Sequence, residues 1–116
     1  MPHIAKTAHK ENTAWMTDNT RLEGFARLGG NAWLRNQAVV RGMAVVSGPS
    51  VIVMDEGVVE DHAQLLYRSL VFDHAVLSGH VKVGGHTQIG GHSKFEGDVT
   101  LNSGLIRDLH WWKDVP

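Results

Sequence analysis

Residues 24–48 read GFARLGGNAWLRNQAVVRGMAVVSG, and this stretch repeats one pattern every six residues. An alanine returns at Ala26, Ala32, Ala38 and Ala44, and a large aliphatic residue follows two places after each of them. Glycine or asparagine stands two places after each aliphatic residue. Because these two residue types accept a positive φ at low cost, the pattern predicts a short strand followed by a sharp corner in every hexad.

The same hexad continues in both directions from this stretch. The large aliphatic positions, which we call anchors, begin at Ile4 and end at Leu101, and sixteen of the seventeen are apolar. A composition of 42% apolar residues would fill about seven of them by chance. Lys10 is the exception, and one residue is inserted near Gly48 and Pro49. The anchors are Ile4, Lys10, Met16, Leu22, Leu28, Leu34, Val40, Val46, Val53, Val59, Leu65, Val71, Leu77, Val83, Ile89, Phe95 and Leu101.

A second position of the hexad is also restricted. Four residues after the anchor, fourteen of the seventeen hexads carry Ala, Ser, Thr or Gly. This position is Ser50 in the hexad of Val46, and it is Leu105, one of the three exceptions, in the hexad of Leu101. Along a strand the small residue and the next anchor point inward, while the residue between them points outward. A helix cannot keep a six-residue spacing on one face, so the sequence predicts an all-β solenoid.

These hexads resemble the hexapeptide-repeat family, whose members are single-stranded, left-handed parallel β-helices with three hexads in each triangular coil. Asn31-Ala32-Trp33-Leu34 and Gly42-Met43-Ala44-Val45-Val46 are similar to the Gly-Asn-Ala-type repeats of bacterial and phage proteins. The resemblance covers residues 4–105 and implies five to six coils. We therefore expect an all-β, left-handed parallel β-helix over residues 1–105, and a C-terminal capping segment over residues 106–116. The cap is expected to place Leu109, Trp111, Trp112 and Val115 over the open end of the last coil.

Outward side chains should stack into columns if one coil holds eighteen residues. Two of these columns are apolar, although the outer wall of a lone solenoid should be mostly polar. A single exposed apolar residue is unremarkable, but several in register predict a contact surface. The predicted interface comprises Trp15, Trp33, Ile52 and Leu70 on one face and Val39, Val58 and Val76 on the next. We expect a homo-oligomer, either a trimer, which is common in the family, or a dimer.

Five histidines occupy outward positions three residues after an anchor. Stacked pairs of them could chelate a divalent cation such as zinc or nickel. The alternative is that they are surface residues copied with the repeat, and the sequence favours this alternative. Zinc usually takes three or four ligands, and we expect no Asp or Glu beside a pair to complete a site. These histidines are His62, His74, His80, His86 and His92.

Composition limits the possible partners and chemistry. The 116 residues include eleven Lys and Arg, twelve Asp and Glu and no Cys, which gives a net charge of −1. The absence of cysteine excludes disulfides, thiolate metal sites and a cysteine nucleophile. Without a basic field or a long apolar run, we expect no nucleic-acid partner and no membrane partner. The N-terminal residues do not read as a secretory signal, so a cytoplasmic setting is expected. Asp55, Glu56, Glu60 and Asp61 are expected to form a solvated acidic corner.

Two classes of function remain after these exclusions. The first is a small rigid binding or scaffold protein that acts through its flat faces, for instance as an accessory or phage-type inhibitor of a partner protein. The second, implied by the resemblance, is an acyltransferase that uses acyl-coenzyme A and a histidine general base at a trimer interface. The chain lacks the extruded loop and the His-Asp-x-x-x-Gly pattern of such enzymes. The sequence therefore favours the binding protein, with no cofactor, metal ligand or catalytic residue.

Overall fold

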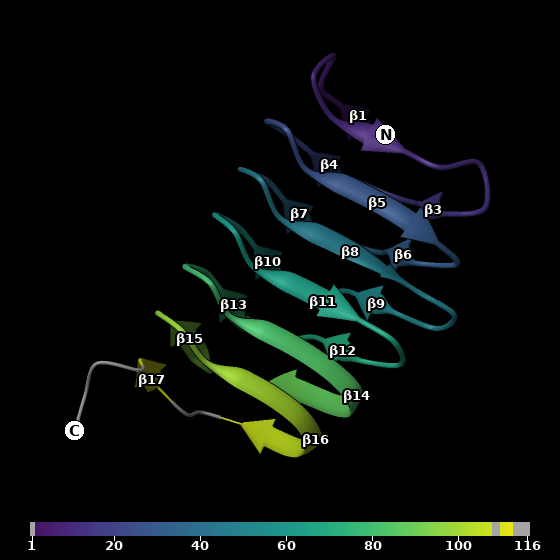
Figure 1. The fold of residues 1–116 in the computed structure, drawn as a ribbon. Coiled ribbons are helices and arrows are strands. Elements are labelled where there is room, and N and C mark those ends of the chain that lie inside the picture. Colours follow the sequence, from purple (N-terminus) through teal and green to yellow (C-terminus); the bar gives the residue numbers. More distant parts are fainter. Residues whose placement is uncertain (1, 108–109, 113–116) are drawn as a thin grey trace.

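The computed structural model describes residues 2–107 and 110–112, with side chains for residues 2–106. These residues are all β, and their parallel strands stack as a solenoid of about six turns, which confirms the predicted fold class. β1 (His3–Ile4) and β17 (His110–Trp112) lie at opposite ends of the stack (Figure 1). The left-handed winding implied by the resemblance stays a prediction.

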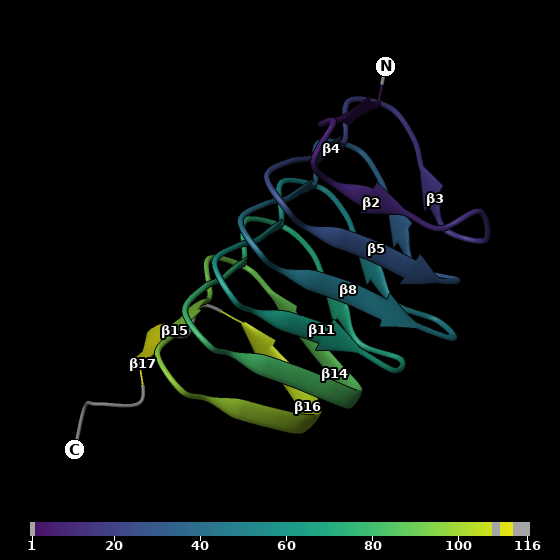
Figure 2. The same ribbon diagram turned by 45° about the horizontal axis from the view of Figure 1, so that its top comes forward.

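The strands form three flat faces that run the length of the stack. The first face is the seven-stranded sheet of β1, β4 (Arg21–Leu22), β7 (Val39–Val40), β10 (Val58–Val59), β13 (Val76–Leu77), β15 (Lys94–Glu96) and β17. The second face holds β2 (His9–Lys10), β5 (Arg27–Gly30), β8 (Val45–Gly48), β11 (Gln64–Leu66) and the first parts of β14 (Lys82–Gly90) and β16 (Thr100–Arg107), which lie side by side in Figure 2. The third face holds β3 (Trp15–Met16), β6 (Trp33–Leu34), β9 (Ile52–Val53), β12 (Leu70–Val71) and the last parts of β14 and β16.

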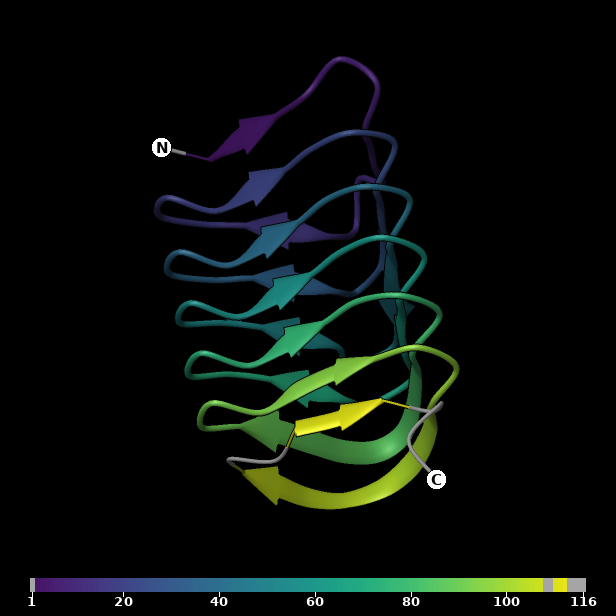
Figure 3. The same ribbon diagram turned by 90° about the vertical axis from the view of Figure 1, so that its left-hand side faces the viewer.

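The second and third faces belong to one ten-stranded sheet because β14 continues round the corner between them. β14 pairs with β11 through Lys82 and Val83, and with β12 through Gln88 and Ile89. The long ribbons of β14 and β16 curve round this corner at the lower end of the stack (Figure 3). The three faces therefore meet at three corners, as expected for coils of three hexads.

The interior is a column of stacked anchors. From Leu22 to Ile89, all the predicted anchors are fully buried, and Phe95 is 1% exposed. Parallel pairing aligns each anchor with those above and below it, so Leu65 lies between Val46 and Val83. Burial of each such side chain contributes about 1.5–3 kcal/mol, which makes this column the main source of stability. Lys10 lies in β2 of the first coil, and its Nζ donates to the carbonyl of Glu11 at 3.2 Å.

The predicted insertion is present, but its position differs by one residue. Before the insertion, neighbouring coils pair residues eighteen apart, as in Trp15 with Trp33, and across it Trp33 pairs with Ile52, nineteen residues away. Val51 is fully buried and Ser50 is exposed, so the assignment of Ser50 to the small inward position was wrong. The extra residue is accommodated in the turn of Pro49 and Ser50, before β9 begins.

A second irregularity was not predicted. Val83 pairs with Leu101 at the usual spacing, but Gln88 pairs with Leu105, which is seventeen residues away. The last coil is thus one residue shorter at the third face, where Ile106 pairs with the anchor Ile89, and two residues shorter at β17, where His110 pairs with Lys94. Leu105, predicted to point inward, is 60% exposed, so that prediction was wrong. The shift adds Leu105 to the outward column of the third face.

The corners have the predicted backbone conformation. The residue two places after the anchor has positive φ in fourteen hexads. These residues are Asp18, Gly24, Gly30, Asn36, Gly42, Gly48, Asp55, Asp61, Tyr67, Asp73, Gly79, Gly85, Gly91 and Gly97. Tyr67 is the departure from Gly, Asn and Asp, and it adopts a φ of 66°. The corners thus fix the length of each strand and the direction of each face.

The C-terminal segment continues the stack with strand pairing as far as the structure describes it. Ile106 and Arg107 belong to β16, and β17 pairs in parallel with β15. Residues 108–109 and 113–116 and all side chains beyond Ile106 lie outside the described residues. The predicted cap of Leu109, Trp111, Trp112 and Val115, like the boundary at residue 105, stays a prediction. No helix within the described ranges has the length and apolar character needed to cross a membrane.

Candidate functional site

The outward column of the third face has the register predicted from the sequence. Trp15 pairs with Trp33, Trp33 with Ile52, and Ile52 with Leu70. The column continues to Gln88 and then to Leu105. We call these six residues, Trp15, Trp33, Ile52, Leu70, Gln88 and Leu105, the tryptophan face. Trp15, Trp33, Ile52 and Leu70 form an unbroken apolar row on this flat side of the solenoid, and Gln88 separates that row from Leu105.

The two ends of the tryptophan face differ in shape. Trp15 is 63% exposed and Trp33 is 37% exposed, and together with Asn31 they line a hollow of about 410 Å³. Arg35 holds its guanidinium 5.0 Å from the ring centre of Trp33, a cation–π contact that steadies this indole. At the other end, Leu105 projects from the last coil. Ile52 and Leu70, between the two ends, are partly exposed.

The predicted valine column is also in register. Val39 pairs with Val58, and Val58 with Val76. Arg21 and Lys94 flank the three valines in this column, which continues to His3 and His110. We call Arg21, the three valines and Lys94 the valine face. Its three valines are all partly exposed, so the face is apolar only in its middle.

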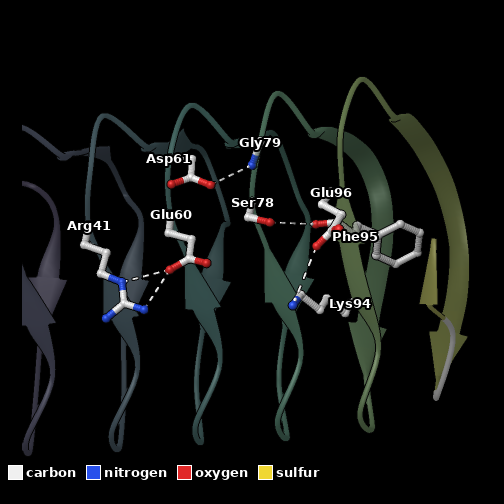
Figure 4. Close-up of polar contacts among 8 residues, drawn as sticks. All are labelled: Arg41, Glu60, Asp61, Ser78, Gly79, Lys94, Phe95 and Glu96. Atoms are coloured by element: carbon white, nitrogen blue, oxygen red, sulfur yellow. Dashed lines mark hydrogen bonds and ion pairs between the residues drawn. The ribbon is translucent and has the colours of Figure 1, made fainter. Parts of the chain in front are cut away.

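Charged side chains border the valine face along one edge. Arg41 forms an ion pair of 2.7 Å with Glu60 from the next coil, and Lys94 lies 3.6 Å from Glu96 (Figure 4). Arg21 and Glu23 form a further pair at 2.6 Å. A partner that covered the valines would have to remove water from these ions, which is costly. The tryptophan face has no acidic residue in its column; Arg35 and Arg68 lie at its edges, and none of these three ion pairs borders it.

The histidines stack as the repeat predicts. The rings of His62 and His80 are parallel with centres 4.9 Å apart, and those of His74 and His92 show the same separation. His86 is exposed and pairs in register with Ser103. Among the described residues, no group of three or more His, Asp or Glu side chains is placed to hold a metal ion.

One histidine has a carboxylate partner that sequence reasoning missed. Nδ1 of His74 lies 2.8 Å from Oε1 of Glu56, which occupies the same outward position one coil earlier. The expectation that no Asp or Glu lies beside a histidine pair was therefore wrong. The signal was available, because Glu56 and His74 are eighteen residues apart, the separation that brings side chains into contact in this fold.

The acidic corner is partnered rather than merely solvated. Oδ2 of Asp55 accepts from the backbone N–H of Asp73 at 3.1 Å, and Oδ2 of Asp61 accepts from that of Gly79 at 3.1 Å (Figure 4 shows the second contact). With the pairs Glu56–His74 and Glu60–Arg41, all four acids contact a neighbouring coil. They are structural residues of the coil-to-coil interface.

Comparison with models of protein families, with curated proteins and with solved structures found no match for this chain. The resemblance to hexapeptide-repeat proteins therefore rests on the residues and on the solenoid that they form.

Proposed function

We propose that this protein is a rigid contact module, which associates with itself and with a protein partner through the flat outer faces of its solenoid. The observation that carries the proposal is the in-register apolar row Trp15, Trp33, Ile52 and Leu70, extended by Leu105. Contiguous exposed apolar surface of this kind is typical of interaction sites. Tryptophan is also among the residues that most often dominate the binding energy of interfaces.

The backbone favours this role because the strands under the row are already fixed. Trp33, for example, donates its backbone N–H to the carbonyl of Val51 at 2.9 Å, and both flanking residues are buried. Association then costs little ordering of the chain, so more of the energy of apolar burial is available for binding. The valine face was predicted as a second contact surface and remains one in this proposal, although its charged border favours the tryptophan face as the stronger of the two.

Polar substitution of the tryptophan face should reduce the mass of the particle in solution. We expect Trp33→Thr combined with Leu70→Thr to convert a dimer or trimer into the 12.7 kDa monomer. Threonine keeps the β propensity of these strand positions, so the fold should survive the change. The measurement is size-exclusion chromatography with multi-angle light scattering at about 100 µM, where an interface of micromolar affinity is largely occupied.

Val45→Thr is the matched control, because Val45 is a partly exposed outward valine on the second face. It should leave the mass unchanged. The proposed contact through the tryptophan face is wrong if the double variant keeps the mass of the unaltered chain, or if the unaltered chain is already monomeric. Circular dichroism of each variant establishes that the fold is intact.

One observation favours acyl transfer as a second candidate function. The pair His74–Glu56 has the geometry in which a carboxylate orients a histidine general base. Both side chains are about half exposed, at 52% and 54%, so a substrate pocket would have to be completed by a second copy of the chain. We place this candidate behind the contact module.

Acetyl-coenzyme A distinguishes the two candidates. A ligand that binds only the native state raises the melting temperature, by an amount that grows with its concentration relative to Kd. If the protein is a contact module, about 1 mM acetyl-coenzyme A should shift the melting temperature by less than about 1 °C. A larger shift that His74→Ala abolishes would support acyl transfer instead. His86→Ala serves as the control, since His86 is exposed and lies at a different corner of the solenoid, whereas His92 stacks on His74.

A further inference from the structure

We infer that two copies of this chain pack through their tryptophan faces in an antiparallel, two-fold arrangement. Leu105 of each copy then packs against Trp15 of the other, at the hollow that Trp15 lines together with Trp33 and Asn31. The inference rests on the proposed function, which supplies the face, and goes beyond it by specifying the partner, the orientation and the symmetry. It follows from how side-chain size and shape change along the face.

Side-chain size falls from one end of the tryptophan face to the other. The six levels of the stack carry Trp15, Trp33, Ile52, Leu70, Gln88 and Leu105 in order. An antiparallel partner opposes the first level with the sixth, the second with the fifth and the third with the fourth. Large rings then face small side chains at the ends, and Ile52 faces Leu70 at the centre. The gap between the two flat faces is nearly constant as a result.

The two ends of the face are also complementary in shape. The hollow of about 410 Å³ is lined by Trp15 of the first level and by Trp33 and Asn31 of the second. Leu105, 60% exposed, is the projecting side chain at the sixth level. A two-fold axis between the third and fourth levels sets each Leu105 against Trp15, at the rim of the other copy's hollow. Self-complementarity of this kind is the condition for a closed, isologous interface.

A parallel arrangement loses this match. It would place each level against the same level of another copy, so that Trp15 meets Trp15 and Trp33 meets Trp33. The tryptophans would then hold the faces apart, and the smaller side chains at Ile52 and Leu70 could not touch. A hollow would face a hollow at one end, and Leu105 would face Leu105 at the other.

The edges of the tryptophan face agree with the antiparallel arrangement. Along one edge, Met54 at the third level opposes Phe72 at the fourth, which brings two partly exposed apolar side chains together. Arg35 at the second level opposes Gly90 at the fifth, and along the other edge Arg68 opposes Ser50. No two like charges are opposed among these residues. At the corner beyond Met54 and Phe72, however, Asp55 and Asp73 oppose each other. Apolar burial and not charge complementarity therefore supports the contact.

The available area suits a reversible dimer. The solenoid measures 22 by 21 Å across, and six levels at about 4.8 Å give a face on the order of 500 Å². Two such faces bury about 1,000 Å² in total, which is near the lower limit for a specific interface. An interface of this area predicts a dimer that dissociates as the protein is diluted through the micromolar range.

Distances between spin labels test the orientation directly. The chain has no cysteine, so Ser50→Cys and Ser103→Cys each create a single labelling site on the same edge of the face. Both serines are exposed, at the third and sixth levels. In the antiparallel dimer the two labels at position 50 lie one level apart along the stack, and the two labels at position 103 lie five levels apart, or about 24 Å. The distance at position 103 should exceed that at position 50 by roughly 10 Å or more.

The result that overturns the antiparallel arrangement is equal distances at the two positions, as any parallel dimer or trimer requires. A trimeric mass by light scattering overturns it as well, while leaving self-association through the face intact. A monomeric mass for both labelled chains at about 100 µM would overturn the proposed self-association itself. If the antiparallel arrangement is correct, Trp33→Thr combined with Leu70→Thr removes the dipolar signal from the labelled Ser50→Cys chain. That loss would show that the measured distances arise from contact through the tryptophan face.

Discussion

Replacement of Leu65 by alanine is expected to lower the free energy of unfolding by about 2–5 kcal/mol. Leu65 is fully buried and is held between Val46 of the preceding coil and Val83 of the following one. Each coil supplies one anchor per face, so no second side chain of the same coil can move into the space. The cavity would therefore persist, and the cost should fall in the upper part of the range that such deletions span.

Gln64→Ala is the matched control because Gln64 is the outward neighbour of Leu65 on β11 and is exposed. A surface substitution of this kind should change stability by less than about 0.5 kcal/mol. Urea denaturation followed by far-ultraviolet circular dichroism measures both variants. Equal midpoints for Leu65→Ala and Gln64→Ala would contradict the assignment of inward and outward positions on this face.

The fold was predictable because each hexad carries its own structural signal. An inward anchor such as Leu34, a small residue such as Ala32 and a corner residue such as Asn36 have separate physical roles, and all three agree. Agreement in most of the seventeen hexads outweighs any single ambiguous position. The columns Trp15–Trp33 and Val39–Val58 followed directly from the eighteen-residue coil, because side chains on neighbouring parallel strands stand in register.

The errors arose where the coil length changes. The insertion near Pro49 was recognised, but its place relative to Ser50 and Val51 depends on which residue the turn can absorb. The shorter last coil was missed, since Ser103 and Leu105 fit the repeat pattern poorly in either register. A one-residue slip in a strand exchanges the inward and outward faces, so Leu105 was assigned to the core although it lies on the surface.

Contacts between coils were the other gap. The hydrogen bond from the backbone of Gly79 to Asp61 and the ion pair of Arg41 with Glu60 join residues eighteen or nineteen apart. The linear sequence suggests an acidic cluster where the fold has separate pairs, because each acid contacts a residue about one coil away: Glu60 contacts the preceding coil and the other three acids contact the following one. Reading the sequence as stacked coils of eighteen residues, with allowance for the insertion, would have identified these partners. Which outer face binds a partner depends on shape and on bordering charge, which the repeat alone does not encode.

The second large effect is expected at Asp73, in the corner between the third and first faces. This corner forms a ladder in which each side chain binds the backbone of the next coil. Oδ2 of Asp73 accepts from the N–H of Gly91 at 2.9 Å, and the N–H of Asp73 donates to Asp55 at 3.1 Å. Asp73 itself has a φ of 55°, in the left-handed region that most side chains avoid.

Asp73→Ala should therefore lower the free energy of unfolding by about 2–3 kcal/mol. The left-handed backbone costs alanine roughly 1–2 kcal/mol, and loss of the hydrogen bond to Gly91 adds about 1 kcal/mol. The same urea denaturation experiment measures the change. Since the contribution comes from an acceptor oxygen and from tolerance of positive φ, it should not require the negative charge of the aspartate.

Asp73→Asn separates these causes. Asn36 occupies the same corner two coils earlier with a φ of 61°, and its Oδ1 accepts from the N–H of Asp55 at 3.2 Å. Asparagine at position 73 should reproduce both features, so we expect stability within about 0.5 kcal/mol of the unaltered chain. If asparagine destabilised the protein as much as alanine does, the carboxylate charge would be the essential feature. The prediction that a neutral acceptor oxygen suffices at this corner would then be wrong. If alanine were as stable as asparagine, the side-chain ladder would contribute nothing, and the corners would be held by the backbone alone.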